Sequence, residues 1–280
     1  MSIENFIPLI WSETLYTNLD KKYIGVANCN RDFEADVKEK GAAIRISGIG
    51  SVDVKNYDRN TDMGEPQTLN DTSTMFIVDQ AKYFNFQIDD VDNAQTTPKL
   101  MSAAMSVAAD ALANEADKYV YGLYENVVKT IRVNETTADN IISTILSARR
   151  KLYEQNVSNP EDIVIEVSPA VAELIFKAKI NLGSDNMEML ENGCIGKIAG
   201  CKVFVSNNIH YDDTSTTGIT FYKCLMRTKR AIAFTQQISE IEAYRPEHRF
   251  ADAVKGLCLY GGGIIYENEI IVLDFGVRNN

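Results

Sequence analysis

The sequence predicts an α+β fold in which long strands and a long helix accompany a compact mixed region. Three observations support this prediction. Residues 41–90 alternate between apolar and polar side chains, the pattern of half-buried strands. Residues 97–129 are rich in strong helix formers, and residues 136–245 mix short amphipathic helices with short strands. The 280 residues show no internal repeat and no low-complexity linker, so we expect one large domain or two closely joined ones.

The N-terminal segment, residues 1–35, carries a narrow apolar stripe. Ile7, Trp11, Leu15 and Leu19 recur every four residues, which predicts one face of a helix. A single stripe on a terminal helix needs a partner surface. That partner is either the core of this chain or a neighbouring subunit.

Residues 36–92 are expected to form a long two-stranded β excursion. Ile44, Ile46, Val52 and Val54 share one parity, and strand character returns at residues 75–78 and 83–88. Because an isolated two-stranded ribbon is marginal in water, an excursion of this length needs support from elsewhere.

The tip of this excursion is polar and rich in turn formers. Its charges suit ion pairing across a subunit boundary. The candidate inter-subunit contacts are therefore Trp11 and Leu15 in the N-terminal segment and Tyr57, Asp58, Arg59, Asp62 and Glu65 at the tip.

Residues 93–135 contain the strongest helix signal. Thr97 can cap the helix, and Pro98 suits its first position. The apolar face is expected to include Val107 and Leu112, and its small alanines favour close packing on a sheet.

Residues 136–245 read as a mixed α/β region, with a helix around 141–152 and a short buried strand at 163–167. A second helix follows Ser168 and Pro169, and strands are expected near 196–206 and 220–226. Residues 246–280 are expected to close the chain with β structure, because they are rich in isoleucine and valine.

Composition narrows the classes of function. The net charge of −11 argues against a protein that binds nucleic acid over its whole surface. No apolar run approaches the ~20 residues of a membrane span, and the N-terminus lacks signal-peptide character, so we expect a cytoplasmic protein. The five cysteines form no C-x-x-C pair and are interpreted as free, mostly buried thiols.

The search for catalytic chemistry is negative. His210 lies beside Asp212 without a second histidine at ligand spacing, so we expect a loop and no metal. Gly261, Gly262 and Gly263 precede β-branched residues, which favours a turn or bulge between strands over a phosphate loop.

Two charged clusters are also interpreted as non-catalytic surface. Glu247, His248 and Arg249, close to Asp252, read as strand or loop surface, because nothing nearby indicates a pocket. The basic stretch from Arg227 to Arg230 reads as a solvated edge or an inter-subunit contact. We therefore predict no enzyme, no cofactor and no metal site, which leaves assembly or binding as the expected role.

The order of these pieces resembles that of the Hong Kong 97-type capsid fold, found in the major capsid proteins of tailed bacteriophages. Local sequence is similar as well, although no single motif is diagnostic. The similar segments are Phe6–Thr14, Asp79–Asp90, Ala231–Gln237, Glu240–Asp252 and Tyr260–Gly263.

The resemblance implies five parts and a function. The parts are an N-terminal arm (1–35), an extended β-hairpin loop (36–92), a spine helix in the peripheral domain (93–135), an axial domain (136–245) and a C-terminal β segment closing the peripheral and axial core (246–280). The implied function is self-assembly into hexamers and pentamers of an icosahedral head, made in the cytoplasm of a bacterial host. Because Met1 stands almost directly before the arm, a separate scaffolding protein is expected if one is used.

The implied partners are other copies of this chain, a portal and decoration proteins, and packaged double-stranded DNA held without sequence-specific binding; no membrane is involved. Three alternatives stay open. An encapsulin-like compartment shell would share the fold and load an enzyme cargo. A tail or other virion component is another structural alternative, and an α/β enzyme using His248 and Asp252 is the alternative from a different class.

Overall fold

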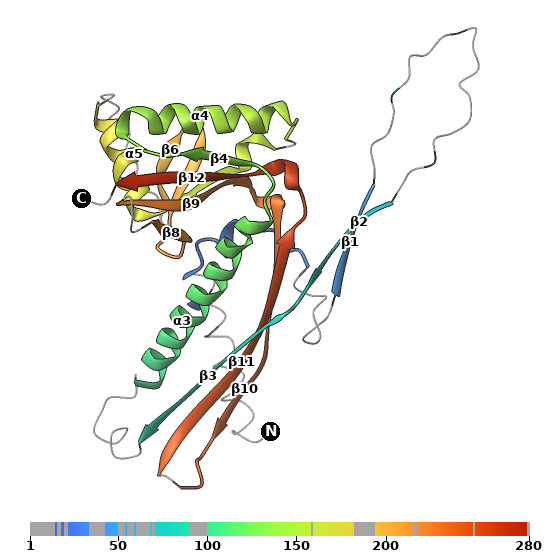
Figure 1. Cartoon of the computed structure of the whole chain (residues 1–280). Coiled ribbons are helices and arrows are strands. Elements are labelled where there is room, and N and C mark those ends of the chain that lie inside the picture. Colours follow the sequence, from blue (N-terminus) through green and yellow to red (C-terminus); the bar gives the residue numbers. More distant parts are fainter. Residues whose placement is uncertain are drawn as a thin grey trace.

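The computed structural model describes most of the chain. The described residues are 15, 18–19, 22–33, 43–49, 54, 59, 68, 71–89, 100–157, 159–181, 194–214, 218–248 and 250–278. Figure 1 shows three parts: a compact unit, a long helix beside long strands, and a narrow ribbon that projects from the strands.

The compact unit is built on a seven-stranded mixed sheet in the order β4-β12-β9-β5-β7-β6, with β8 paired to β9. Its strands are β4 (Thr130–Val133), β5 (Ile163–Val167), β6 (Cys194–Ile198), β7 (Cys201–Val205), β8 (Tyr211–Thr214), β9 (Ile219–Thr228) and β12 (Ile270–Arg278). Strand β5 pairs in parallel with β7 and antiparallel with β9, and all five of its residues are buried, as its continuous apolar run predicts.

Helices α4 (Ala138–Glu154) and α5 (Pro169–Asn181) cover one face of this sheet. The inward face of α4 carries Ile141, Ile145, Ala148 and Leu152, all of them fully buried at helical spacing. The helix begins with a reciprocal capping box, in which the Thr137 backbone N–H donates to Asn140 Oδ1 at 2.9 Å. The predicted helix around 141–152 is therefore confirmed.

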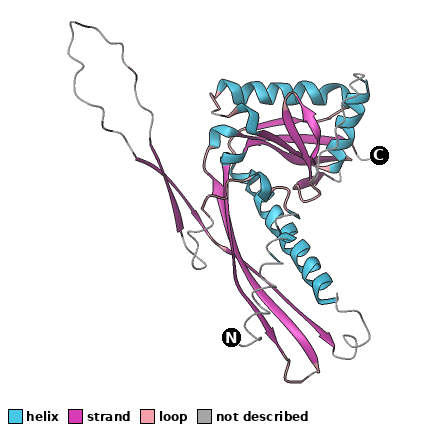
Figure 2. Cartoon of the chain, turned by 180° about the vertical axis from the view of Figure 1, so that it is seen from behind, coloured by secondary structure: helices cyan, strands magenta, loops and turns pink. Residues whose placement is uncertain are grey.

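A separate three-stranded antiparallel sheet runs alongside helix α3 (Leu100–Gly122) in the order β10-β11-β3 (Figures 1 and 2). Its strands are β3 (Gln80–Asp89), β10 (Ile232–Tyr244) and β11 (Ala251–Ile264). This arrangement corrects two expectations. Residues 83–88 pair with β11 and are not part of the two-stranded excursion. Residues 232–244 belong to this sheet too, so the chain leaves the compact sheet after Thr228 and not near residue 245.

The ribbon consists of β1 (Ala43–Ile49) and β2 (Asp71–Ile77), paired antiparallel from Ala43–Ile77 to Ile49–Asp71. Ile44 and Phe76 are directly opposite each other and buried at its base, where they join a small apolar cluster with Val78, Ala233 and Leu259. Both views show the ribbon pointing away from the rest of the chain.

Helix α3 confirms the strongest helix prediction, and the 3-10 turn η4 (Leu123–Asn126) extends it. Thr97 and Pro98 lie outside the described residues. Met105, Ala109 and Ala116 pack into the main core together with residues of the three-stranded sheet and of the inner face of the compact sheet. The expected face was partly wrong, because Val107 is exposed.

The glycine run 261–263 also differs from expectation. It is not a turn, because it lies inside β11 and pairs with β10. A Cβ atom at Gly261 would lie 2.5 Å from the carbonyl oxygen of Ile77, and one at Gly263 would lie 2.9 Å from Phe76 Cβ. The absence of side chains therefore lets the corner between β2 and β3 cross directly over β11.

Candidate functional site

The residues considered for chemistry do not form a reactive cluster in the described part of the chain. His210 stacks on Tyr124, and its Nε2 lies 3.7 Å from Asp212 Oδ1. Asp212 is already paired with Lys223 at 2.8 Å. Among the described residues, no group of three or more His, Cys, Asp or Glu side chains could hold a metal ion.

Of His248 and Asp252, the pair considered for an enzyme, Asp252 is engaged in an ordinary surface ion pair. The Asp252 carboxylate lies 3.4 Å from Arg245 Nε, and both side chains are more than half exposed. Within the ranges that the structure describes, no helix is long and apolar enough to cross a membrane. Four cysteines, Cys29, Cys201, Cys224 and Cys258, are free and buried, as expected.

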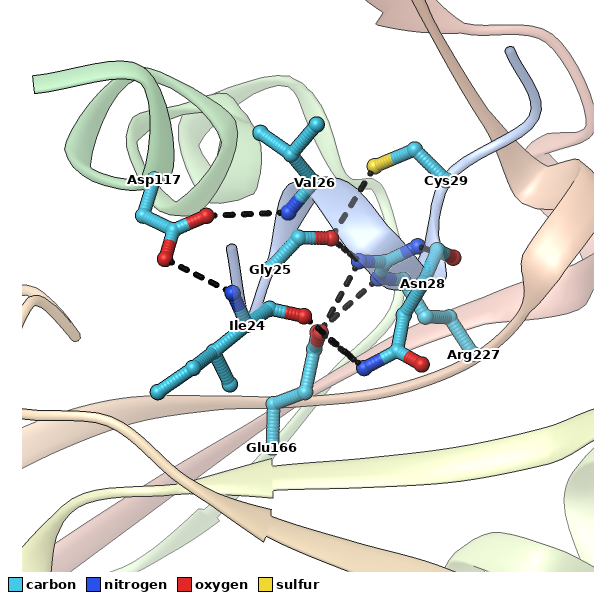
Figure 3. A network of polar contacts seen from close by, with 8 residues as sticks. All are labelled: Ile24, Gly25, Val26, Asn28, Cys29, Asp117, Glu166 and Arg227. Carbon is cyan, nitrogen blue, oxygen red and sulfur yellow. Dashed lines mark hydrogen bonds and ion pairs between the residues drawn. The ribbon is translucent and has the colours of Figure 1, made fainter. Parts of the chain in front are cut away.

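The most developed polar arrangement is a buried clamp around residues 24–29, which include the 3-10 turn η2 (Val26–Asn28) (Figure 3). From α3, the Asp117 carboxylate accepts the backbone N–H groups of Ile24, at 3.0 Å, and Val26, at 2.9 Å. These are the free donors at the start of a helical turn, which a carboxylate satisfies well.

From the compact sheet, Arg227 and Glu166 complete the clamp. Arg227 Nε and Nη2 donate to the two Glu166 carboxylate oxygens at 2.9 Å each, and both side chains are 0% exposed. The same guanidinium donates to the carbonyl oxygens of Gly25, at 3.0 Å, and Asn28. Asn28 Nδ2 returns a bond to Glu166 Oε1 at 3.3 Å.

The clamp joins three parts of the chain through one short segment. Asp117 is on α3, whereas Glu166 and Arg227 are on β5 and β9 of the compact sheet, and all three bind residues 24–28. Residues 24–28 are therefore fixed within their own chain, and they fix the long helix against the compact unit. Tyr23 adds a bond to the three-stranded sheet by donating its hydroxyl to Gln236.

Burial also shapes the acid–base behaviour of the clamp. Removal from water raises the pKa of Asp117 to about 6, although the bonds from Val26 and Ile24 oppose the shift. Burial likewise raises the pKa of Glu166, and the adjacent Arg227 guanidinium opposes that shift. The clamp therefore holds two acids whose charged forms are disfavoured by their surroundings.

Sequence reasoning missed this clamp and misplaced Arg227. The solvated edge expected for residues 227–230 is wrong for Arg227, which is completely buried. Arg230 is partly buried and pairs with Glu269 at 2.6 Å. The signal was a charged residue in each of two apolar strands, Glu166 in Ile163–Val167 and Arg227 after Leu225 and Met226, because buried charges of opposite sign are expected to pair.

Of the seven candidate contact residues, the structure describes two, Leu15 and Arg59. Leu15 is fully buried in the chain's own main core, which is the first of the two partners considered for its stripe. Arg59 is an exposed turn residue. Trp11, Tyr57, Asp58, Asp62 and Glu65 lie outside the described residues.

The structure points to a different exposed surface on the ribbon. Met75 and Ile77 lie on the face opposite to buried Phe76, and they are 65% and 56% exposed. Large apolar side chains are exposed elsewhere too, with Tyr83 on β3 at 78% and Phe250 before β11 at 86%.

Comparisons with known proteins find this architecture in solved structures only. No protein-family model and no curated protein sequence matches the chain. A structure from Mycobacterium phage Che8 matches with a TM-score of 0.70 and 24% identity, covering 90% of each chain. The capsid of Ralstonia phage GP4 matches with a TM-score of 0.68 and 10% identity, covering 93% of this chain and 91% of that one.

An encapsulin complex from Synechococcus elongatus also matches, with a lower TM-score of 0.54 and 11% identity over 85% of this chain and 83% of that one. At these identities the likeness is one of fold. The chain therefore has the Hong Kong 97-type fold, and the predicted α+β class is confirmed.

Proposed function

We propose that this chain is the major capsid protein of a tailed bacteriophage, which assembles into hexamers and pentamers of an icosahedral head around the genome. The likeness to the GP4 capsid over nine-tenths of the chain supports this proposal. Its named parts would be the N-terminal arm, the β1–β2 ribbon as the extended loop, α3 as the spine helix, the three-stranded sheet as the peripheral domain, and the seven-stranded sheet as the axial domain.

The observation that carries the proposal is the ribbon. Two strands that pair only with each other are marginal in water, yet this ribbon presents Met75 and Ile77 to solvent. Because Met75 and Ile77 are 65% and 56% exposed, each would contribute about 1–2 kcal/mol if a neighbour buried the rest of it. An arm that gains stability only on a neighbour is the kind of element that links subunits into a closed shell.

The encapsulin-like alternative is favoured by one observation, the match to the Synechococcus complex, and its TM-score is lower than those of the phage structures. The two functions differ in what the shell encloses. Mass spectrometry of shells purified from the native source would find a single packaged enzyme for an encapsulin, and DNA with portal and other virion proteins for a phage head.

The finer parts of the proposal concern partners and place. The chain would act without catalysis, in the virion, after assembly in the cytoplasm of a bacterial host. Its partners would be further copies of itself, a separate scaffolding protein, a portal and decoration proteins. Packaged double-stranded DNA would be held without base-specific contacts, in keeping with the net charge of −11.

The test changes the exposed face of the ribbon and measures assembly. In the double variant Met75→Glu/Ile77→Glu, two charges replace apolar contacts, so we expect capsomers and shells to be lost in analytical ultracentrifugation while the far-UV circular dichroism is kept. The matched control Met75→Leu/Ile77→Val keeps an apolar face and should assemble as the wild type does. Normal shells from the glutamate variant would refute the role given to the ribbon.

A further inference from the structure

The corner between the ribbon and the three-stranded sheet is built around one phenol. Strand β3 pairs with β11 only as far as Gln80 opposite Tyr260, whereas β11 continues along β10 to Ile264. Beyond this point β11 has no β3 partner. The chain from β2 turns there through Val78 and Asp79.

Tyr119 of α3 occupies the place of the missing partner. Its hydroxyl accepts the backbone N–H of Gly262 at 3.3 Å and lies 3.2 Å from the Gly262 carbonyl oxygen. The same hydroxyl lies 3.4 Å from Asp79 Oδ1. Since a phenol has a single hydrogen, it donates to one of these two acceptors at a time, and a single side chain serves both the strand end and the corner.

The ring of Tyr119 is held in place from the opposite side. It packs edge-to-face on Tyr260, with ring centroids 5.5 Å apart. One turn earlier on the helix, Glu115 pairs with Lys82 of β3 at 3.4 Å. Helix α3 therefore contacts both β3 and the corner that precedes it.

The far side of the corner is equally constrained. A Cβ atom at Gly261 would lie 2.7 Å from Val78 Cα, and one at Gly263 would lie 2.9 Å from Phe76 Cβ. Val78 itself is completely buried. On one side, the segment that crosses β11 packs directly on glycine backbone. On the other side, its Asp79 carboxylate lies within hydrogen-bonding distance of the Tyr119 hydroxyl.

We propose that Tyr119 is a positioning residue: its hydroxyl sets the angle at which the β1–β2 ribbon leaves the three-stranded sheet, and through that angle it restricts the curvature of the assembled shell. The second half of this inference rests on the proposed function, whereas the first half concerns the single chain. Because β1 and β2 project from this corner, a small change of angle at the corner displaces the opposite end of the two strands by a larger distance. A fixed corner angle would hold the ribbon of every copy in the same position relative to the neighbouring copy.

The test removes the hydroxyl alone, with Tyr119→Phe, which keeps the ring against Tyr260. The matched control is Tyr124→Phe, because that hydroxyl belongs to a ring stacked on His210, away from the corner. In the unassembled chain, Tyr119→Phe should speed native-state hydrogen exchange at the Gly262 amide about three- to tenfold, as expected for one lost hydrogen bond. Tyr124→Phe should leave that rate unchanged.

The ribbon angle is measured directly with two spin labels, at exposed Met75→Cys on β2 and at exposed Ala111→Cys on α3. Tyr119→Phe should broaden the distance distribution, and Tyr124→Phe should not. An unchanged distribution, or equal broadening by both variants, would overturn the positioning role.

The shell arm of the test compares particle diameters by electron microscopy. Wild-type and Tyr124→Phe shells should share one diameter, and Tyr119→Phe should give a wider range. Uniform Tyr119→Phe shells of wild-type size would overturn the link to curvature. If the wild-type chain forms no shells, the proposed function fails, while exchange and spin-label distances still decide the role of Tyr119.

Discussion

Replacing Arg227 with methionine tests the buried clamp. Methionine fills a similar volume without charge, so the change removes hydrogen bonds more than packing. Arg227 makes two bonds to Glu166 and one each to the carbonyl oxygens of Gly25 and Asn28, all without exposure to water. After the change, Asn28 Nδ2 at 3.3 Å is the remaining donor to the Glu166 carboxylate among the residues that the structure describes.

The expected loss follows from the charge left behind. Breaking a fully buried ion pair from one side costs about 3–5 kcal/mol, because the remaining ion has neither water nor a partner. The two carbonyl oxygens add to this loss. Since domains are typically stable by about 5–15 kcal/mol, the variant should lie close to unfolding.

The assay is urea unfolding of the unassembled chain, followed by far-UV circular dichroism at low protein concentration, because assembly would raise the apparent stability. We expect a loss of at least about 3 kcal/mol at pH 7. The control Arg150→Met breaks an exposed i,i+4 pair with Glu154 and should cost about 0.5 kcal/mol or less.

Two further results identify the cause. The loss in Arg227→Met should shrink as the pH falls toward 5, because protonation neutralises the abandoned Glu166. The double variant Arg227→Met/Glu166→Met should lose less than the sum of the single variants, since it leaves no unpaired charge. A loss below about 1 kcal/mol, or strict additivity, would refute the reasoning.

Two other perturbations follow from the same contacts. The pKa of Asp117 in the folded chain is about 6, above its ordinary 3.8, so its contribution to stability is largest below about pH 4 and is lost as the pH rises through 6. On going from pH 7 to pH 4, the wild type should therefore gain up to about 3 kcal/mol of unfolding free energy relative to Asp117→Asn. Urea unfolding at a series of pH values measures this difference, and equal pH dependence of the two proteins would contradict it. Gly262→Ala would place a Cβ atom 2.7 Å from the Ala233 carbonyl oxygen and should lower the unfolding free energy by about 1–3 kcal/mol, whereas Gly122→Ala meets no atom within 4 Å and serves as the control in the same assay.

Local periodicity was sufficient for elements whose own sequence determines them. Helix α4 and strand β5 appear where predicted, because the first buries one stripe at helical spacing and the second is buried along its whole length. Helix α3 was located as well, but its buried face was not. Val107 has the right spacing for the core, yet the positions of the two sheets leave it exposed.

Strand partnership could not be predicted from the sequence in the same way. Strands β3 and β10 alternate as clearly as β1 does, and alternation shows which side chains share a face without showing which strand lies alongside. The long pairing of β11 with both of them joins segments more than 150 residues apart for β3. Only the fold brings these edges together, and this is why residues 83–88 were placed in the ribbon.

Neither the clamp nor the close packing of the β2–β3 corner on residues 261–263 could be predicted from the sequence, for related reasons. Arg227 has an ordinary basic neighbourhood in sequence, with Lys229 and Arg230 close by, and only its place inside a buried strand gives it a structural role. The glycines 261–263 looked like a turn because turns favour glycine. Here the demand is the close approach of another chain segment, which is a property of tertiary structure.

The most direct test of the capsid proposal is electron microscopy of the purified wild-type chain, alone and together with the scaffolding protein proposed above. We predict closed shells or rings of six and five subunits, with the β1–β2 ribbon of each copy lying on a neighbour and the face of Met75 and Ile77 covered. A chain that stays monomeric under every condition, or shells in which this face remains exposed to solvent, would contradict the account.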